Sequence, residues 1–363
     1  MNTLKVRIIF IEREKDKVNR SIGGDSMPGW NLKEGILTEL EVSDDEYWSL
    51  FNFVFSDACR KTNTYKFGLI KSICDQIYDV HDDGDQFFLS YEKIFSKFAE
   101  NYWNLVNKYK LKQMSYNGKS EYSKIELIIK AAVENCEIPE NVGFQALCDK
   151  NRSAIIKEVT AECKKCVVGA LYNDFEGKLY AFSLRGDGIF LSEGACRFMA
   201  KYKMEIEKLN YYAWARFLEK VNDDDALIRV LEKLDMATPQ RKDLSMYRDI
   251  LYNEFQENTC FYCGKRLNKN VHVDHFIPWT FVKNDNLWNF VLACPKCNLK
   301  KSGNLVGREY VVKIDSRNAS IMNRSTLSSS IRVEFDGYYD GLLDRMWSYA
   351  KMSGIREREE IMT

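Results

Sequence analysis

Two cysteine pairs constrain the fold of this chain more than any other feature of its sequence. Each pair is a Cys-x-x-Cys turn, Cys260 with Cys263 and Cys294 with Cys297, and 30 residues separate the two pairs. Two such turns can present four thiolates to one ion, which is the ligand set of a structural zinc site. A simple zinc ribbon has about 15–20 residues between its pairs, so we expect a folded insert between the two halves of this site.

The rest of the chain carries no sign of export or of membrane insertion. The apolar run at residues 4–12 is short and contains Arg7, which predicts a strand and not a signal peptide. No apolar stretch of about 18 residues occurs, so we expect no membrane partner. Eleven cysteines without a secretion signal favour a reducing, cytoplasmic location, where paired cysteines bind metal. A third pair, Cys163 with Cys166, has no partner pair nearby, and we interpret it as ordinary helix-end cysteines.

Length and patterning predict an α+β fold that is predominantly α. The 363 residues suggest about two domains. We expect a mainly helical N-terminal recognition or regulatory region over 1–238, with a second subdomain from about 152, and a zinc-stapled domain with C-terminal helices over 239–363. Alternating residues around two turn signals predict a small β-meander at 166–192. We expect a first helix that begins at Ser43. Further helices are expected at about 63–79, 88–108, 121–135, 152–165, 193–220, 225–235 and 239–255.

Charge is balanced over the whole chain but not within the cysteine frame. The chain has 53 basic and 53 acidic residues, so any footprint for a polyanion must be local. Residues 260–301 contain seven basic residues and the acids Asp274 and Asp285, and seven minus two gives +5. A phosphate partner and a solvated basic surface both explain this excess. The basic residues are Lys265, Arg266, Lys269, Lys283, Lys296, Lys300 and Lys301.

The insert contains the stretch HVDHFIP, which has two of the three histidines of the chain. As a strand, it places His272 and Asp274 on one face and His275 on the other. The four cysteines already complete a zinc site, so the histidines are not needed there. Asp274 is a hard oxygen ligand that suits Mg²⁺ or Mn²⁺. His275, neutral at pH 7, can accept a proton from water.

The order of residues in this region resembles the HNH endonucleases, the ββα-metal finger nucleases. Asp274-His275, then Asn289, then the helix start CPKCNLKK with Asn298 follow one another within the four-cysteine frame, over about residues 258–305. The resemblance implies a strand ending at Asp274-His275, a second strand at 290–293 and a helix opened by Cys294 and Pro295. It also implies metal-dependent hydrolysis of nucleic-acid phosphodiester bonds, with DNA as the expected substrate.

The same resemblance implies roles for individual residues. His275 would be the general base, and Asp274 and Asn298 would hold one catalytic Mg²⁺ or Mn²⁺ ion. Asn289 would be structural and would help to orient His275. We expect a non-catalytic role for His272, because it lies on the strand face opposite His275.

The remaining residues of this region allow more than one interpretation. Lys300 or Lys301 could contact phosphate, or both could be surface residues. The aromatic residues Trp279, Phe281 and Trp288 could stack on bases, but we expect them to fill the core of a small module.

At the level of the whole chain, an HNH centre attached to a larger helical region looks like prokaryotic restriction or anti-phage defence proteins, which is an argument by analogy. The alternative is a non-catalytic zinc module that binds nucleic acid or protein. The sequence leaves open whether the protein forms a homo-oligomer or binds a regulatory protein partner.

Overall fold

The computed structural model describes residues 32–358 except 40, 83–85, 117, 137, 140–141, 237–243, 269, 325–326 and 336. The strand expected at 4–12 and the helix start expected at Pro239 lie outside the described residues. The chain divides into two compact units. Unit 1 holds the described residues up to Ile73, then Asp82–Phe198 and Leu209–Leu234. Unit 2 holds Cys74–His81, Met199–Lys208 and the chain from Asp235 onward.

A five-stranded sheet in the order β1-β4-β5-β3-β2 lies in the N-terminal part of the fold. The pairs β1–β4, β4–β5 and β3–β5 are antiparallel. Gly188 pairs with Ser90, and a Cβ atom at this glycine would lie 2.3 Å from the carbonyl oxygen of Leu89, so the close approach of β5 to β3 requires glycine. The strands are β1 Glu34–Gly35, β2 His81–Asp82, β3 Gln86–Ser90, β4 Tyr180–Ser183 and β5 Gly188–Ser192.

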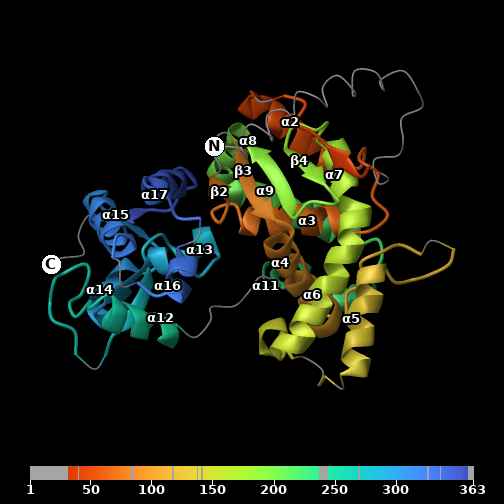
Figure 1. Cartoon of the computed structure of the whole chain (residues 1–363). Helices are drawn as coiled ribbons and strands as arrows, with labels where there is room; N and C mark the ends of the chain where they lie inside the picture. Colours follow the sequence, from red (N-terminus) through yellow and green to blue (C-terminus); the bar gives the residue numbers. More distant parts are fainter. Residues whose placement is uncertain are drawn as a thin grey trace. The chain divides into compact units, whose positions relative to one another are not determined.

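Helices make up most of unit 1. Ser43, Ser90 and Ser123 cap three of them, and each serine hydroxyl accepts a hydrogen bond from the backbone N–H three residues later. Helices α4, α5 and α6 lie side by side (Figure 1). The helices that belong wholly or partly to unit 1 are α2 Asp44–Phe55, α3 Tyr65–Asp75, α4 Tyr91–Trp103 with a π-helical turn Asn104–Lys108, α5 Lys124–Asn135, a 3₁₀ turn Phe144–Ala146, α6 Asp149–Cys163 with a π-helical turn Lys164–Val168, α7 Gly169–Asp174, α8 Glu193–Lys201, α9 Lys203–Leu218, α10 Asp224–Leu227 and α11 Val230–Met236.

The β-meander predicted at 166–192 is only half correct. The hairpin β4–β5 and its turn at 185–188 are confirmed. The first half is wrong, because Lys164–Val168 and α7 are helical and bury Val167, Val168 and Leu171. A short apolar run looks alike in a buried helix and in a strand, and periodicity alone does not separate them. The strand that pairs with β5 on its other side is β3. It includes residues 88–90, which were expected to begin the helix at 88–108, so that helix starts later, at Tyr91 of α4.

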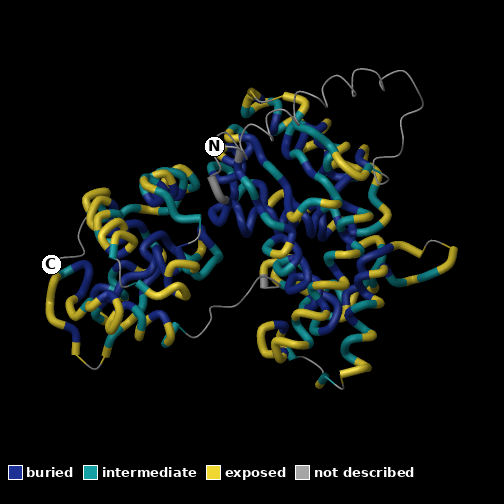
Figure 2. The backbone as a smooth tube through the Cα atoms, viewed as in Figure 1, coloured by how far each residue is buried: buried dark blue, intermediate teal, exposed yellow. Residues whose placement is uncertain are grey.

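Unit 2 contains the four-cysteine frame and the C-terminal helices. Phe276, Phe281, Trp288 and Phe290 are fully buried in its core. Figure 2 colours the buried parts of the chain dark blue. Its strands are β6 His272–His275, β7 Phe290–Ala293, β8 Leu305–Val306 and β9 Glu357–Arg358. Its helices are α12 Ser245–Asp249 with a π-helical turn Ile250–Glu254, α13 Trp279–Val282, a 3₁₀ turn Leu287–Asn289, α14 Pro295–Lys301, α15 Glu309–Met322, α16 Ser329–Glu334 and α17 Leu342–Met352.

The predominantly helical α+β class predicted from the sequence is confirmed, with small sheets beside many helices. No helix among the described residues has the length and apolar character needed to span a bilayer.

Candidate active site and metal centre

The site is built on a hairpin followed by a helix. β6 and β7 pair antiparallel, with His272 opposite Ala293 and His275 opposite Phe290. Helix α14 begins directly after β7, with Cys294 as its N-cap and Pro295 in its first turn. Proline suits this position, because the N–H it lacks has no partner within a helix. The strands and the helix start therefore follow the ββα order expected from the sequence.

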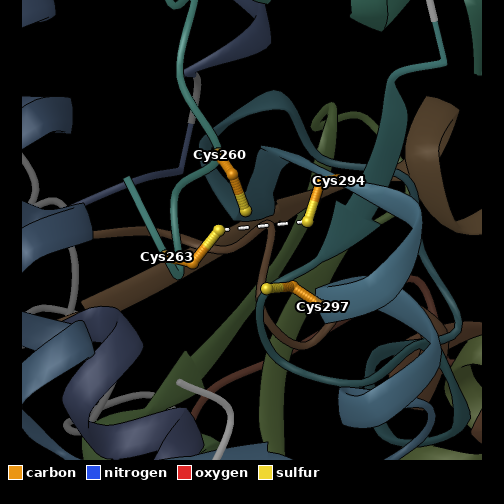
Figure 3. A group of neighbouring side chains, drawn as sticks. All are labelled: Cys260, Cys263, Cys294 and Cys297. Carbon is orange, nitrogen blue, oxygen red and sulfur yellow. Dashed lines mark hydrogen bonds between the residues drawn. The ribbon is translucent and has the colours of Figure 1, made fainter. Parts of the chain in front are cut away.

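Four cysteine sulfurs meet beside this hairpin (Figure 3). The Sγ atoms of Cys260, Cys263, Cys294 and Cys297 all lie within 4.8 Å of one another, and those of Cys263 and Cys294 are 3.9 Å apart. The first turn is closed by a 2.8 Å hydrogen bond from Gly264 N–H to the carbonyl of Cys260, with Gly264 at a φ of +70°. All four cysteines are free thiols.

The cluster fits the donor set of a structural zinc ion. Tetrahedral Zn–S bonds of about 2.3 Å place the sulfurs about 3.8 Å apart, close to the spacing of Cys263 and Cys294. Burial opposes ionisation of the Cys294 thiol, but hydrogen bonds from the backbone of Cys297 and from the neighbouring thiols outweigh it and lower the Cys294 pKa to about 7. The Cys294 thiolate is therefore accessible near neutral pH, whereas burial raises the pKa of Cys260 and of Cys297, so these two thiols would lose their protons on binding the ion.

Asp274 is buried, and its Oδ2 atom accepts one hydrogen bond and forms one ion pair. The Tyr262 hydroxyl donates to Oδ2 at 2.5 Å, and the Lys301 ammonium group lies 3.0 Å from it. Burial and the nearby Asp274 carboxylate raise the pKa of Tyr262 well above its ordinary value, so this phenol stays a donor. Among the described residues both of these contacts fall on Oδ2 and neither on Oδ1.

His275 is held from both the ring and the backbone. Its Nε2 atom lies 2.9 Å from Oδ1 of Asp285, and its carbonyl oxygen accepts a 2.7 Å hydrogen bond from Lys301. The ring packs against Phe290 with a centroid distance of 4.6 Å and an interplanar angle of 67°. Its side chain is 7% exposed, so burial together with these contacts restricts the position of the imidazole.

Asn298 of α14 lies against His272 of β6. The Asn298 Nδ2 atom is 2.9 Å from His272 Nδ1. Lys301, one helical turn further along α14, contacts Asp274. One face of α14 therefore faces the strand face that carries both His272 and Asp274, as the alternation of the strand predicts. The two residues expected to hold the catalytic ion, Asp274 and Asn298, lie on these facing elements.

Asn289 closes the loop that follows His275. Its side-chain oxygen accepts a 2.8 Å hydrogen bond from Ile277 N–H, and its amide nitrogen donates to the Ile277 carbonyl at 3.1 Å. Its own carbonyl accepts a 2.7 Å hydrogen bond from Phe276 N–H. Asn289 is buried, so these bonds fix the path of the chain directly after β6.

The two alternatives that the sequence left for Lys301, a phosphate contact or a surface residue, are both wrong. Lys301 cannot contact phosphate, because its side chain has no exposed surface and pairs with Asp274. Lys283 is also engaged, with Asp235 at 2.7 Å, so the local excess of +5 includes lysines committed to ion pairs. Among the aromatic residues, Phe281 and Trp288 are fully buried and confirm the core interpretation, whereas Trp279 is partly exposed.

Three contact residues were not predicted from the sequence: Tyr262, Lys301 in its buried role, and Asp285. The first two converge on Asp274 and the third on His275. One signal was available, because Asp285 is the only acid besides Asp274 between the cysteine pairs. The third Cys-x-x-Cys pair stays outside the metal site: Cys163 is buried in α6, and Cys166 contacts Glu162.

Comparison with known families agrees with this geometry. The family model described as HNH endonuclease matches residues 260–303, which spans the first cysteine pair, β6, β7 and α14. The C-terminal part of the chain contains an HNH module. Searches of curated proteins and of solved structures returned no match. Members of the HNH family are in general nucleases. The HNH module is therefore the part of this chain that suggests a nuclease-type function.

Proposed function

We propose that this protein is a metal-dependent HNH endonuclease that hydrolyses phosphodiester bonds of nucleic acid, with DNA as substrate. The observation that carries the proposal is the arrangement within the region matched by the HNH family. Asp274 and His275 end one strand, and Asn298 faces that strand from α14. The cysteine pairs that flank β6 and β7 in the sequence, Cys260–Cys263 and Cys294–Cys297, have their sulfurs within 4.8 Å of one another, and a bound zinc ion would connect them.

His275 is the proposed general base. A neutral imidazole takes a proton from the attacking water, whose oxygen forms a bond to phosphorus. The bond from phosphorus to the 3′ oxygen breaks, and the leaving oxygen takes up a proton from solvent. The products are a 3′-hydroxyl and a 5′-phosphate.

Asp274 and Asn298 are the proposed ligands of the catalytic ion. Oδ1 of Asp274 and the side-chain oxygen of Asn298 are hard oxygen donors, which suit Mg²⁺ or Mn²⁺ with waters completing the shell. When bound, such an ion supplies stabilisation of the negative charge that develops on phosphate and on the leaving oxygen. Lys301 and Tyr262 hold the Asp274 carboxylate from its other oxygen, so its orientation is set by the protein itself.

His272 has a supporting part in this proposal. Its Nδ1 accepts from the Asn298 amide group at 2.9 Å, which leaves the Asn298 oxygen available to the ion. Asn289 has a structural part, because it fixes the backbone at Ile277, two residues after His275.

Nucleic acid would be held through exposed basic residues of the same module. Lys265, Arg266 and Lys296 are exposed, unlike Lys301. Exposed cations release counterions from a phosphate backbone on binding, which supplies affinity without sequence preference. Unit 1 would then provide target recognition, oligomerisation or control, as in a restriction or anti-phage defence protein.

A non-catalytic zinc module that binds nucleic acid or protein is the competing function. The ion pair between Asp274 and Lys301 favours it, because a carboxylate neutralised by lysine binds a cation less strongly. This function needs the four cysteines but neither Asp274 nor His275.

Cleavage and binding measured side by side separate the two functions. Zinc-loaded protein is incubated with plasmid DNA and with structured RNA, with Mg²⁺, with Mn²⁺ and with no added divalent ion. Omitting the ion, instead of adding a chelator, keeps the zinc cluster intact. The proposal expects DNA cleavage only with the added ion, and Asn298→Ala requires more of it. Binding of DNA with no cleavage of either nucleic acid under any of these conditions would support the non-catalytic module.

A further inference from the structure

The loop Lys283–Asp285 follows α13 and ends at the residue that contacts the imidazole of His275. Oδ1 of Asp285 lies 2.9 Å from Nε2 of His275, across ten positions of sequence. Both side chains are largely buried, with 11% of Asp285 and 7% of His275 exposed. Neither the resemblance to the HNH family nor the order of its motif residues assigns a role to Asp285.

This contact determines which nitrogen of His275 carries hydrogen. A carboxylate only accepts hydrogen bonds, so the atom that faces it, Nε2, must be the N–H of the neutral imidazole. The lone pair then lies on Nδ1. Contact with Phe290 limits rotation of the ring, and Lys301 holds the carbonyl of His275, so the direction of Nδ1 is set as well.

We propose that Asp285 is the positioning residue of the general base: it fixes His275 as the Nε2–H tautomer, with Nδ1 as the nitrogen that takes the proton from water, and the anchored loop Lys283–Asn284 holds Asp285 in place. The inference rests on the proposed nuclease function, since it assigns a part in the same site.

The anchoring of the loop is visible in the two residues before Asp285. Lys283 has a left-handed φ of +49°, uncommon for a residue with a side chain. Its ammonium group lies 2.7 Å from Asp235 and 3.5 Å from the buried Glu207. These ion pairs hold the loop at the point where the chain leaves α13.

Asn284 provides the second anchor. Its amide nitrogen donates to Asp79 Oδ2 at 2.7 Å, and it lies 3.5 Å from the carbonyl oxygen of Asp75. Asp75, Asp79 and Glu207 come from segments far from the HNH motif in sequence but within the same compact unit. The position of Asp285 therefore depends on residues contributed by Cys74–His81 and Met199–Lys208.

Histidine NMR tests the tautomer directly. The chain has three histidines, so ¹⁵N-histidine labelling of the full-length protein gives three imidazole spin systems, and His275→Ala identifies the one of interest. Two-bond ¹H–¹⁵N correlations distinguish the Nε2–H from the Nδ1–H form. The expected result is the Nε2–H form in the wild type and a mixture of both forms in Asp285→Ala. An Nδ1–H form in the wild type, or an unchanged pattern in Asp285→Ala, overturns the proposal.

Kinetics give the second readout. Asp285→Asn keeps the size of the side chain but can donate to Nε2 and so favour the wrong tautomer, and we expect kcat to fall on the order of 10²–10⁴-fold with KM little changed. Asp285→Glu restores the carboxylate, and we expect it to recover part of that loss. Asn284→Ala should lower kcat less than Asp285→Asn does. Asp249→Asn, at an exposed aspartate of the same unit, is the matched control.

Failure of the inference and failure of the nuclease function give different results. An Nε2–H tautomer that depends on Asp285, in a protein that cuts no nucleic acid, supports the positioning of His275 and rejects the nuclease. Cleavage that requires His275 but stays within twofold of wild type in Asp285→Asn supports the nuclease and overturns the part assigned to Asp285.

Discussion

Lys301 and Asp274 form a buried ion pair with 3.0 Å between the ammonium nitrogen and Oδ2, and the lysine side chain has no exposed surface. The same ammonium group donates to the carbonyl of His275. One lysine on α14 thus holds both residues of the Asp-His sequence that ends β6. This contact couples the helix of the HNH module to its first strand.

Replacing Lys301 tests that coupling. Lys301→Met keeps most of the side-chain volume but leaves the Asp274 carboxylate without its ionic partner. We expect the free energy of unfolding to fall by about 3–5 kcal/mol, because an uncompensated buried charge remains. Chemical denaturation measures it, and Lys296→Met, at an exposed lysine of the same helix, should stay within about 0.5 kcal/mol of wild type. Equal stability of the two variants would show that the ion pair contributes nothing.

The zinc cluster is tested by metal content. Cys260→Ser removes one of four thiolate ligands, so the purified protein should lose most of its bound zinc, which elemental analysis detects as about one ion per chain in the wild type. Unit 2 should also unfold at a lower denaturant concentration, because zinc binding contributes to folding. Cys166→Ser, from the third Cys-x-x-Cys pair, is the control and should retain zinc. Full zinc content in Cys260→Ser would mean that the four cysteines do not bind the ion together.

Asn289 is expected to matter for stability as well as for activity. Asn289→Ala removes both hydrogen bonds to the backbone of Ile277 and leaves buried polar groups without partners. Each such group costs about 1–3 kcal/mol, so the loss of unfolding free energy should exceed that of an exposed substitution several-fold. Denaturation of Asn289→Ala beside Asn268→Ala, at an exposed asparagine of the same unit, checks this. A loss no greater than that of Asn268→Ala would contradict the structural role of Asn289.

His272 and Asn298 should differ in their effects on binding of the catalytic ion. Asn298→Ala removes a proposed ligand, whereas His272→Ala removes the group that orients it, and loss of such a supporting contact lowers metal affinity by roughly tenfold or more. Titration of zinc-loaded protein with Mn²⁺, followed by the paramagnetic signal of free Mn²⁺, should show the larger loss in Asn298→Ala. Equal losses would make His272 a ligand itself.

The sequence predicted those parts of the site that depend on local signals. The cysteine turns, Pro295 at the helix start and the alternation of β6 are each encoded within a few residues, and the structure has the corresponding elements. The first half of the predicted meander was wrong, because Val167, Val168 and Leu171 are as compatible with a buried helix as with a strand.

Contacts between different helices and strands could not be predicted from the sequence pattern. Nothing near Lys301 in the sequence distinguishes it from the more accessible Lys300, because its burial is decided by packing of α14 on β6. The anchors of Asp285 lie still further away, since Asp79 is 205 positions from Asn284. Such pairs are fixed by the tertiary fold and carry no periodic signal.

The rate of DNA cleavage by His275→Ala tests the central claim most directly. Wild type and variant are compared in single-turnover reactions with a labelled duplex at saturating Mg²⁺ or Mn²⁺. Beforehand, the two proteins are shown to have the same zinc content and the same free energy of unfolding. Loss of a general base predicts that cleavage slows by about 10²–10⁴-fold while binding of the duplex is retained. Cleavage by His275→Ala at the wild-type rate would contradict the account.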